Sequence, residues 1–206
     1  MRRLWGRANS VNVQKVLWGL DELGLPYERI EAGGAHGIVD AAAYRALNPN
    51  GLVPTLQEDG FVLWESNAIL RYLAEAHGGP LALPQDARAR ARIAQWLDWQ
   101  ATSFTPAMRD AFWQTYRVAD GQRDHEAVAA SLARTERHAE TLDRHLANQP
   151  FVAGDRFSIA DIAVGCAAHR WLHLPLAIAE RPALSRWYAE IAARPGAAQV
   201  IAEPIS

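Results

Sequence analysis

Short runs of β-like character and stretches of helical periodicity alternate along the first eighty residues. The β-like runs are RRLWG, YERIEA, VPTL and FVLWE. Between the first two runs, apolar residues recur in steps of three and four: Val13, Val16, Leu17, Leu20 and Leu23. This spacing predicts a helix that begins near Asn12 and ends at Gly24 and Pro26.

The same strand-like and helical patterns continue as far as residue 80, where the composition of the chain changes. AAAYRAL predicts a short helix, and the Asp-Gly of QEDG predicts a hairpin between VPTL and FVLWE. SNAILRYLAEAHGG returns to helical spacing and ends on glycines. Two glycines and two prolines in GGPLALPQDA then indicate a linker at 80–85.

After the linker the chain is predicted to be helical throughout. The helical segments are 86–118, 124–147, SIADIAVGCAAHRWL and RPALSRWYAEIAARP. We therefore expect an α/β domain over 1–79, with a mixed four-stranded sheet, followed by an all-helical domain over 86–206.

Composition narrows the possible functions. Of 206 residues, 50% are hydrophobic and 21% charged, as in soluble globular proteins, and a net charge of -2 disfavours nucleic acid as a partner. No run of eighteen apolar residues and no signal-peptide pattern occurs, so we expect a cytoplasmic protein without a membrane segment. Cys166 is the single cysteine, which excludes an intrachain disulfide and a zinc thiolate cluster, and we expect no metal site.

Val53-Pro54 stands at the start of a predicted strand. Proline cannot donate a hydrogen bond to a sheet, so Pro54 is either a strand-entry residue or part of a cis turn. A cis bond would turn the backbone N–H and C=O of Val53 toward an extended, peptide-like ligand.

Glu65 and Ser66 lie where the last strand passes into a helix. Ser66 is expected at the N-cap, where its hydroxyl and the first free N–H groups would attract a carboxylate. Glu65 could hold an ammonium group, so the pair would suit an α-amino acid head. The alternative is a simple helix cap with a solvated acid beside it.

Asn9, Ser10 and Asn12 join the first strand to the first helix. A hydroxyl or amide at a helix N-terminus can donate to an anion, and a thiolate held there would have a lowered pKa. The alternative is that all three are ordinary turn and cap residues.

In their order along the chain, NPNGLVPTL, ESNAILRYL, AGDRFSIADIAV and RPALSRWYAEIAARP resemble the cytosolic glutathione S-transferases of bacterial type over essentially the whole sequence. The resemblance implies a thioredoxin-like first domain that binds glutathione. It also implies a helical second domain that forms most of the pocket for a small hydrophobic electrophile, and a homodimer. Glutathione would be a co-substrate, with no tightly bound cofactor.

The resemblance also assigns roles to residues. Val53 beside cis-Pro54 would meet the cysteinyl backbone of glutathione, and Glu65 with Ser66 would hold the γ-glutamyl amino and carboxylate groups. Leu52 stands where relatives often carry Lys or Gln to bind the glycyl carboxylate, and His36 is a substitute for that contact.

The thiolate partner follows from a Thr-x-Asn pattern of other bacterial relatives, which maps onto Ser10 and Asn12. Ser10 is expected to donate to the thiolate, assisted by Asn12 and Asn9. Candidates for the electrophile pocket follow helical steps, with core packing as the alternative for each: Phe104, Met108, Arg109, Trp113 and Tyr116.

The expected activity is transfer of the glutathione thiol to hydrophobic electrophiles. Glutathione-dependent disulfide or peroxide reduction is the alternative among enzymes, and a non-catalytic glutathione-binding protein is the alternative of another class. Ser158 and Asp161 form a Ser-x-x-Asp arrangement, interpreted as a capping box that helps folding. Cys166 follows among small apolar residues and is expected to be buried and inert.

Overall fold

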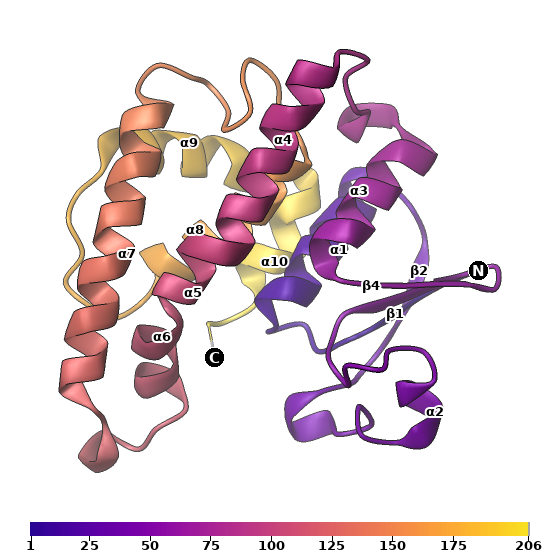
Figure 1. Cartoon of the computed structure of the whole chain (residues 1–206), viewed down its shortest axis with the longest axis horizontal. Coiled ribbons are helices and arrows are strands. Elements are labelled where there is room, and N and C mark those ends of the chain that lie inside the picture. Colours follow the sequence, from indigo (N-terminus) through magenta and orange to yellow (C-terminus); the bar gives the residue numbers. More distant parts are fainter. Residues whose placement is uncertain (206) are drawn as a thin grey trace. The chain divides into compact units, whose positions relative to one another are not determined.

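In the computed structural model, which describes residues 1–205, the first part of the chain forms one mixed sheet (Figure 1). Its strands are β1 (Arg2–Trp5), β2 (Tyr27–Ile30), β3 (Thr55–Glu58) and β4 (Phe61–Trp64). The strand order is β2-β1-β3-β4, with β1 parallel to β2 and the other pairs antiparallel. The predicted mixed four-stranded sheet and its hairpin are confirmed.

Two long helices accompany the sheet, α1 (Val11–Glu22) and α3 (Ser66–His77), which lie against each other (Figure 1). They approach closely at Gly19, where an added Cβ would come within 2.8 Å of Leu70 Cδ2. The short helices of this part are η1 (Gly34–His36), α2 (Ala42–Arg45) and η2 (Gly79–Leu81). Most of α1 from Val11 to Leu20 is buried, so this helix forms the centre of the first core.

Residues 194–203, near the end of the chain, belong to this first unit and not to the helical one. The chain divides into a unit of Met1–Leu83 with Arg194–Glu203 and a unit that consists mainly of Pro84–Ala193. Arg194 binds the Glu22 carboxylate, and Gln199 Nε2 donates to Tyr27 Oη at 2.8 Å. These polar contacts explain why η5 (Pro195–Ala197) and α10 (Ala198–Ala202) depart from the expected all-helical domain over 86–206.

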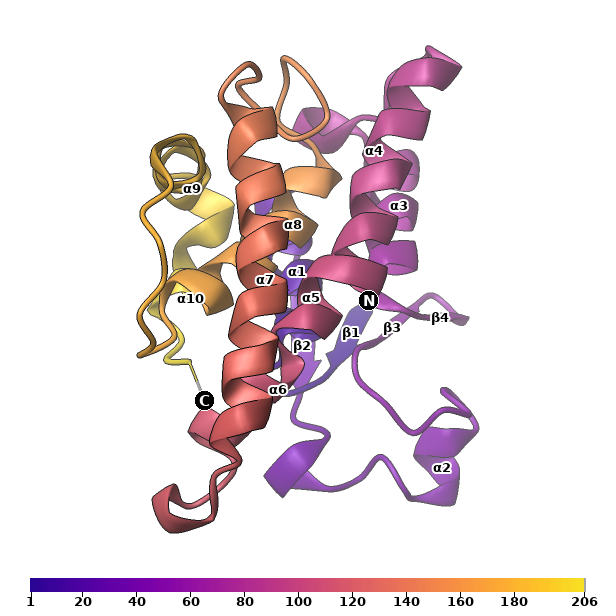
Figure 2. The same cartoon turned by 60° about the vertical axis from the view of Figure 1, so that its left-hand side comes forward.

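The second unit is helical, as expected (Figure 2). Its helices are α4 (Ala87–Trp99), the π-helical turn η3 (Gln100–Phe104), α5 (Thr105–Ala107), α6 (Arg109–Tyr116), η4 (Asp120–Gln122), α7 (His125–Leu146), α8 (Ile159–Leu172) and α9 (Pro182–Ala192). Helix α8 is buried from Ile159 to His169 and contacts both α4 and α9. It is therefore the central element of this unit.

The capping box at the start of α8 is confirmed. Asp161 Oδ2 accepts from the Ser158 backbone N–H at 2.9 Å, and Ser158 Oγ accepts from the Ala160 N–H at 3.3 Å. Asp161 Oδ1 also accepts from Val152 N–H at 2.9 Å and from Trp187 Nε1 at 3.0 Å. One carboxylate thus joins α8 to the preceding loop and to α9, and burial raises its pKa to about 6.

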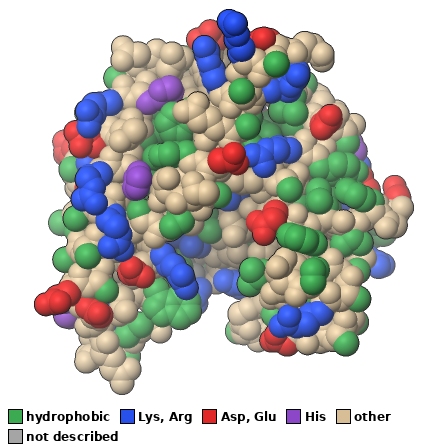
Figure 3. Space-filling model, in the orientation of Figure 1, with side chains coloured by type: hydrophobic (Ala, Val, Ile, Leu, Met, Phe, Trp, Pro, Cys, Tyr) green, Lys and Arg blue, Asp and Glu red, His purple; other side chains and the backbone are tan. Residues whose placement is uncertain are grey.

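On the face shown in Figure 3, basic and acidic side chains are interspersed. Among residues 1–205, no helix is long and apolar enough to cross a membrane.

Candidate active site

A hollow of about 130 Å³ opens in the first unit, at the end of the sheet where β1 finishes and β3 begins. Its lining comes from the start of α1, the loop before β3, and the start of α3: Asn12, Asn48, Asn50, Leu52, Val53, Pro54, Glu65 and Ser66. Three motifs that are separate in the sequence therefore meet at one place.

The loop before β3 presents an unpaired stretch of backbone to this hollow. The Val53-Pro54 bond is cis, so the cis alternative describes the structure, and β3 begins one residue later at Thr55. Within residues 1–205, the N–H and C=O of Val53 make no hydrogen bond. These two groups can therefore pair with the backbone of an extended ligand.

A buried network that the sequence reasoning missed holds this loop in place. Tyr44 Oη donates to the Leu52 carbonyl at 2.6 Å, and Asn48 Nδ2 donates to the same oxygen at 2.9 Å. Both side chains also contact Thr55 Oγ1, at 2.9 and 3.2 Å. Burial raises the pKa of Tyr44, which keeps its hydroxyl protonated as a donor. The Asn-Pro-Asn-Gly motif and the tyrosine of AAAYRAL were visible signals, but neither reveals this contact.

The corner at Glu65 and Ser66 differs from the prediction by one position. Helix α3 begins at Ser66, and Glu65 is the N-cap residue, with φ of 70°. The Ser66 hydroxyl does not cap its own helix. It donates to Asn12 Oδ1 at 3.3 Å and accepts from Lys15 Nζ at 3.3 Å. The exposed Glu65 carboxylate and the first N–H groups of α3 share the rim of the hollow.

Lys15 is a further residue that sequence reasoning missed. It is 2% exposed, and its Nζ also donates to Asn67 Oδ1 at 3.2 Å. The signal in the sequence was the run of apolar residues around Lys15. A helix that is apolar on most of its faces leaves a lysine no exposed face to occupy. The ammonium group therefore lies inside the first unit, directly behind Ser66.

The three candidates at the start of α1 do not occupy equivalent places. Asn12 is exposed and lines the hollow. Ser10 is the N-cap of α1 and 8% exposed, and its side chain makes no capping hydrogen bond. Asn9 is half-buried, and neither it nor Ser10 lines the hollow. Asn12 thus has the most direct access to a ligand there.

The two candidates for the glycyl carboxylate lie in different surroundings. Leu52 lines the hollow and is 63% exposed, but its side chain offers no donor. His36 is in η1, outside the lining, with Nε2 3.5 Å from the Glu31 carboxylate.

The candidates for the electrophile pocket lie in the second unit, and they differ in exposure. Phe104 and Met108 are buried, with Phe104 stacked on Trp99 at 5.1 Å between ring centres. Arg109 and Trp113 are exposed, whereas Tyr116 is half-buried and donates to the His173 carbonyl at 3.4 Å. The burial of Phe104 and Met108 supports the core-packing alternative for these two.

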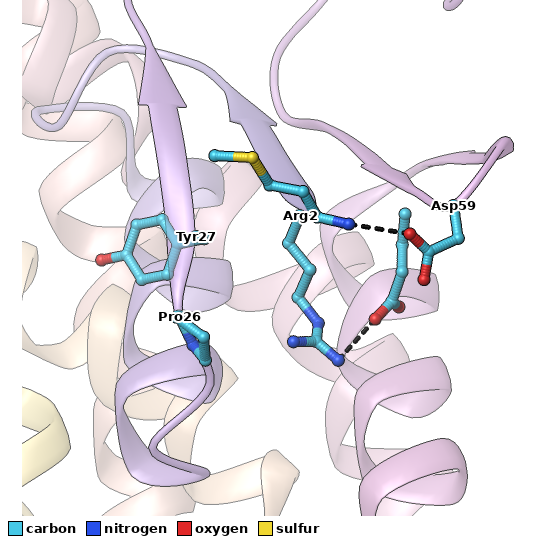
Figure 4. Close-up of a pocket in the computed structure, with 6 residues that line it drawn as sticks. Arg2, Pro26, Tyr27 and Asp59 are labelled. Atoms are coloured by element: carbon cyan, nitrogen blue, oxygen red, sulfur yellow. Dashed lines mark hydrogen bonds and ion pairs between the residues drawn. The ribbon is translucent and has the colours of Figure 1, made fainter.

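Two further hollows have linings that are less suited to a peptide-like ligand. One, of about 220 Å³, lies at the opposite end of the sheet, where the N-terminal ammonium binds Asp59 at 2.7 Å and Arg2 binds Glu58 at 2.5 Å (Figure 4). The other lies in the second unit between Arg92 of α4 and His145 of α7. Among the described residues, no three His, Cys, Asp or Glu side chains gather as metal ligands.

Comparisons with known proteins identify the family of the chain. Models of the glutathione S-transferase N-terminal and C-terminal domains match residues 9–76 and 104–195. The chain is 39% identical over 208 residues to glutathione S-transferase GstB of Escherichia coli (strain K12), covering 100% of both chains. It is 30% identical to disulfide-bond oxidoreductase YfcG of Escherichia coli (strain K12), covering 94% of this chain and 92% of that protein.

Among solved structures, the theta class glutathione S-transferase of Xanthomonas axonopodis pv. citri with glutathione bound is 42% identical, with a TM-score of 0.96. The match covers 100% of this chain and 99% of that one. With likeness along its full length, the chain belongs to the glutathione S-transferase family. Its first unit is accordingly the thioredoxin-like domain, and the resemblance inferred from the motifs is confirmed.

Proposed function

We propose that this glutathione S-transferase binds glutathione in the hollow lined by Asn12, Val53 and Ser66, and transfers its thiol to hydrophobic electrophiles. The observation that carries the proposal is the meeting, in one hollow, of unpaired backbone at Val53, the Glu65 carboxylate and the N-terminus of α3. These groups complement a peptide backbone, an ammonium group and a carboxylate, which glutathione combines in one molecule.

Each end of the ligand has a partner of matching chemistry. The N–H and C=O of Val53 pair with the cysteinyl residue in the manner of an added strand. The Ser66 N–H and hydroxyl, with the dipole of α3, bind the γ-glutamyl carboxylate, while Glu65 binds the α-amino group. A hollow of about 130 Å³ accommodates the amino-acid head, so the rest of the tripeptide extends along the open surface.

The start of α1 activates the thiol. Asn12 donates through its side-chain amide to the sulfur, and Ser10 is a second donor at the same helix end, assisted by Asn9. Hydrogen bonds to the charged form stabilise the thiolate and lower the pKa of the bound thiol. The thiol proton leaves to solvent, the sulfur lone pair forms a bond to the electrophilic carbon, and the leaving group departs with its electron pair.

The second unit supplies the electrophile pocket in this proposal. Trp113 and Arg109 are its exposed candidates, and an indole face suits an apolar, aromatic substrate. The enzyme contributes orientation and anion stabilisation, since glutathione itself provides the nucleophile.

Glutathione-dependent disulfide reduction is the second candidate. The 30% identity to a protein named disulfide-bond oxidoreductase favours it. In that reaction the bound thiolate attacks one sulfur of the disulfide, and a second glutathione completes the reduction by releasing oxidised glutathione. The same site would serve both reactions, because each begins with a thiolate of lowered pKa.

Binding and turnover measurements decide among these functions. Calorimetry should show glutathione binding, and turnover should follow with 1-chloro-2,4-dinitrobenzene. Turnover confined to hydroxyethyl disulfide or cumene hydroperoxide would favour the reductase or peroxidase. Binding without turnover on all three would favour a binding protein, and no binding of glutathione would contradict the proposal.

The homodimer and the cytoplasmic location belong to the proposal as well. Phe61 and Trp64 are exposed apolar side chains on β4, an edge strand of the sheet, and such residues are typical of a surface that a second copy covers. Light scattering of the purified protein should give twice the chain mass of 22.7 kDa. Fractionation of cells should place the protein in the cytosol.

A further inference from the structure

The chain contains twenty arginines but only one lysine, Lys15, and that lysine lies behind the proposed carboxylate site. Its Nζ is 3.3 Å from Ser66 Oγ and 3.2 Å from Asn67 Oδ1, so it contacts the first two residues of α3. A lysine offers a compact charge on a flexible stem, whereas an arginine offers a wider planar fork. Lys15 is 2% exposed, so its ammonium group is enclosed where α1 meets the start of α3.

The direction of the hydrogen bonds follows from the chemistry of the ammonium group. An ammonium group only donates, so Ser66 Oγ must accept from Lys15. The single proton of the hydroxyl is then directed away from Lys15, toward Asn12 Oδ1 and the hollow. Ser66 is thereby prepared to donate to a ligand carboxylate that takes the place of the Asn12 oxygen.

The charge of Lys15 acts on the same group. Lys15 carries a positive charge, and it contacts the neutral Ser66 hydroxyl and the neutral Asn67 amide oxygen. A carboxylate oxygen bonded to Ser66 Oγ would lie within roughly 6 Å of Lys15 Nζ, where an opposite charge stabilises a carboxylate. The site is largely shielded from water on the protein side because Ser66 is 5% exposed.

We infer that Lys15 is a positioning residue of the glutathione site, which orients the Ser66 hydroxyl and balances the charge of the γ-glutamyl carboxylate. This inference rests on the proposed function. A purely structural role, in which Lys15 only ties α1 to α3, would stabilise the fold equally with any ligand. The two roles therefore differ in whether Lys15 responds to the ligand carboxylate itself.

A cycle that combines a variant with a ligand analogue tests this difference. The analogue is 4-aminobutyryl-cysteinyl-glycine, which lacks only the γ-glutamyl carboxylate. Calorimetry should show at least tenfold weaker glutathione binding for Lys15→Met, with little change for the analogue, and partial recovery in Lys15→Arg. Equal losses for both ligands would overturn the inference while leaving the proposed function intact, and no binding of glutathione by the unmodified protein would overturn both.

A measurement on the unmodified protein covers the case in which Lys15→Met fails to fold. Protein labelled with ¹⁵N at the lysine side chain gives one NMR signal, because the chain has a single lysine. Glutathione should shift this Nζ signal, and the analogue at saturation should shift it much less. Equal shifts for the two ligands would overturn the inference.

Discussion

Ser66 Oγ donates to Asn12 Oδ1 at 3.3 Å, although the two residues are separated by 54 positions in the chain. This contact joins the residue proposed for the amino-acid head of glutathione to the residue proposed for its thiol. The start of α3 and the start of α1 therefore form one polar surface. Binding of the ligand at one end can thus affect the orientation of the amide at the other.

Replacement of Asn12 should change the acidity of the bound thiol. Loss of one hydrogen bond to a charged group costs about 1.5–3 kcal/mol, so Asn12→Ala should raise the pKa of bound glutathione by roughly one to two pH units. Ser10→Ala should raise it by less, because Ser10 does not line the hollow. Thiolate absorbance near 240 nm as a function of pH measures both. A larger effect of Ser10→Ala would make Ser10 the principal donor, and no effect of either would point to Asn9.

Substitutions of Glu65 can separate an effect on glutathione binding from an effect on the stability of the fold. Its φ of 70° lies in a region that L residues rarely adopt, at a cost of about 1–3 kcal/mol, whereas glycine adopts it readily. Both Glu65→Ala and Glu65→Gly should weaken glutathione binding by roughly tenfold or more, because each removes the partner of the ammonium group. Glu65→Gly should unfold at a temperature no lower than Glu65→Ala. Unchanged affinity in both variants would contradict the assignment of the ammonium site.

The sequence was sufficient for the elements and for their order. Strand and helix periodicity located α1, the β3–β4 hairpin and α7, because each has a regular pattern bounded by turn or cap residues. The place of residues 194–203 was not predictable in this way. They pack on α1 through the pairing of Arg194 with Glu22, a contact between distant segments that no local pattern encodes.

The site was predictable where motifs face it directly. Val53, Glu65 and Asn12 line the hollow, and each was marked by an unusual local feature: a proline at a strand start, an acid at a helix start, and a polar helix entrance. Lys15 and Tyr44 were missed because their roles depend on partners from other elements. Ser66 was misplaced by one position because Glu65 turns the chain with a positive φ, which residue type does not predict.

Cys166 should be dispensable for turnover. It is fully buried in α8, so its thiol is shielded from reagents and substrates. Cys166→Ala should keep glutathione transfer within about twofold of the unmodified enzyme, with some loss of stability from the smaller side chain. The native protein should react with a disulfide reagent only after denaturation. A large loss of turnover in a folded Cys166→Ala variant would contradict glutathione as the only nucleophile.

Asp161 should make the stability of the fold depend on pH. Burial raises the pKa of its carboxyl to about 6 in the folded protein, above the ordinary value of 3.8. A group with a raised folded pKa contributes stability that is fully present below the unfolded pKa and is lost as the pH rises through the folded one. The free energy of unfolding therefore increases as the pH falls from about 7 to 4. At 1.36 kcal/mol per unit of pKa shift, the contribution of Asp161 amounts to about 2–3 kcal/mol.

Asp161→Asn provides the matched comparison, because other groups titrate in both proteins and cancel in the difference. At pH 7 the variant should be less stable by about 1–3 kcal/mol, since its amide NH₂ faces N–H donors that the carboxylate accepts from. The difference in the free energy of unfolding should grow as the pH falls to 4, as measured by urea denaturation at each pH. A difference that shrinks toward low pH would show that the hydrogen bonds to the carboxylate outweigh burial and hold the carboxyl ionised.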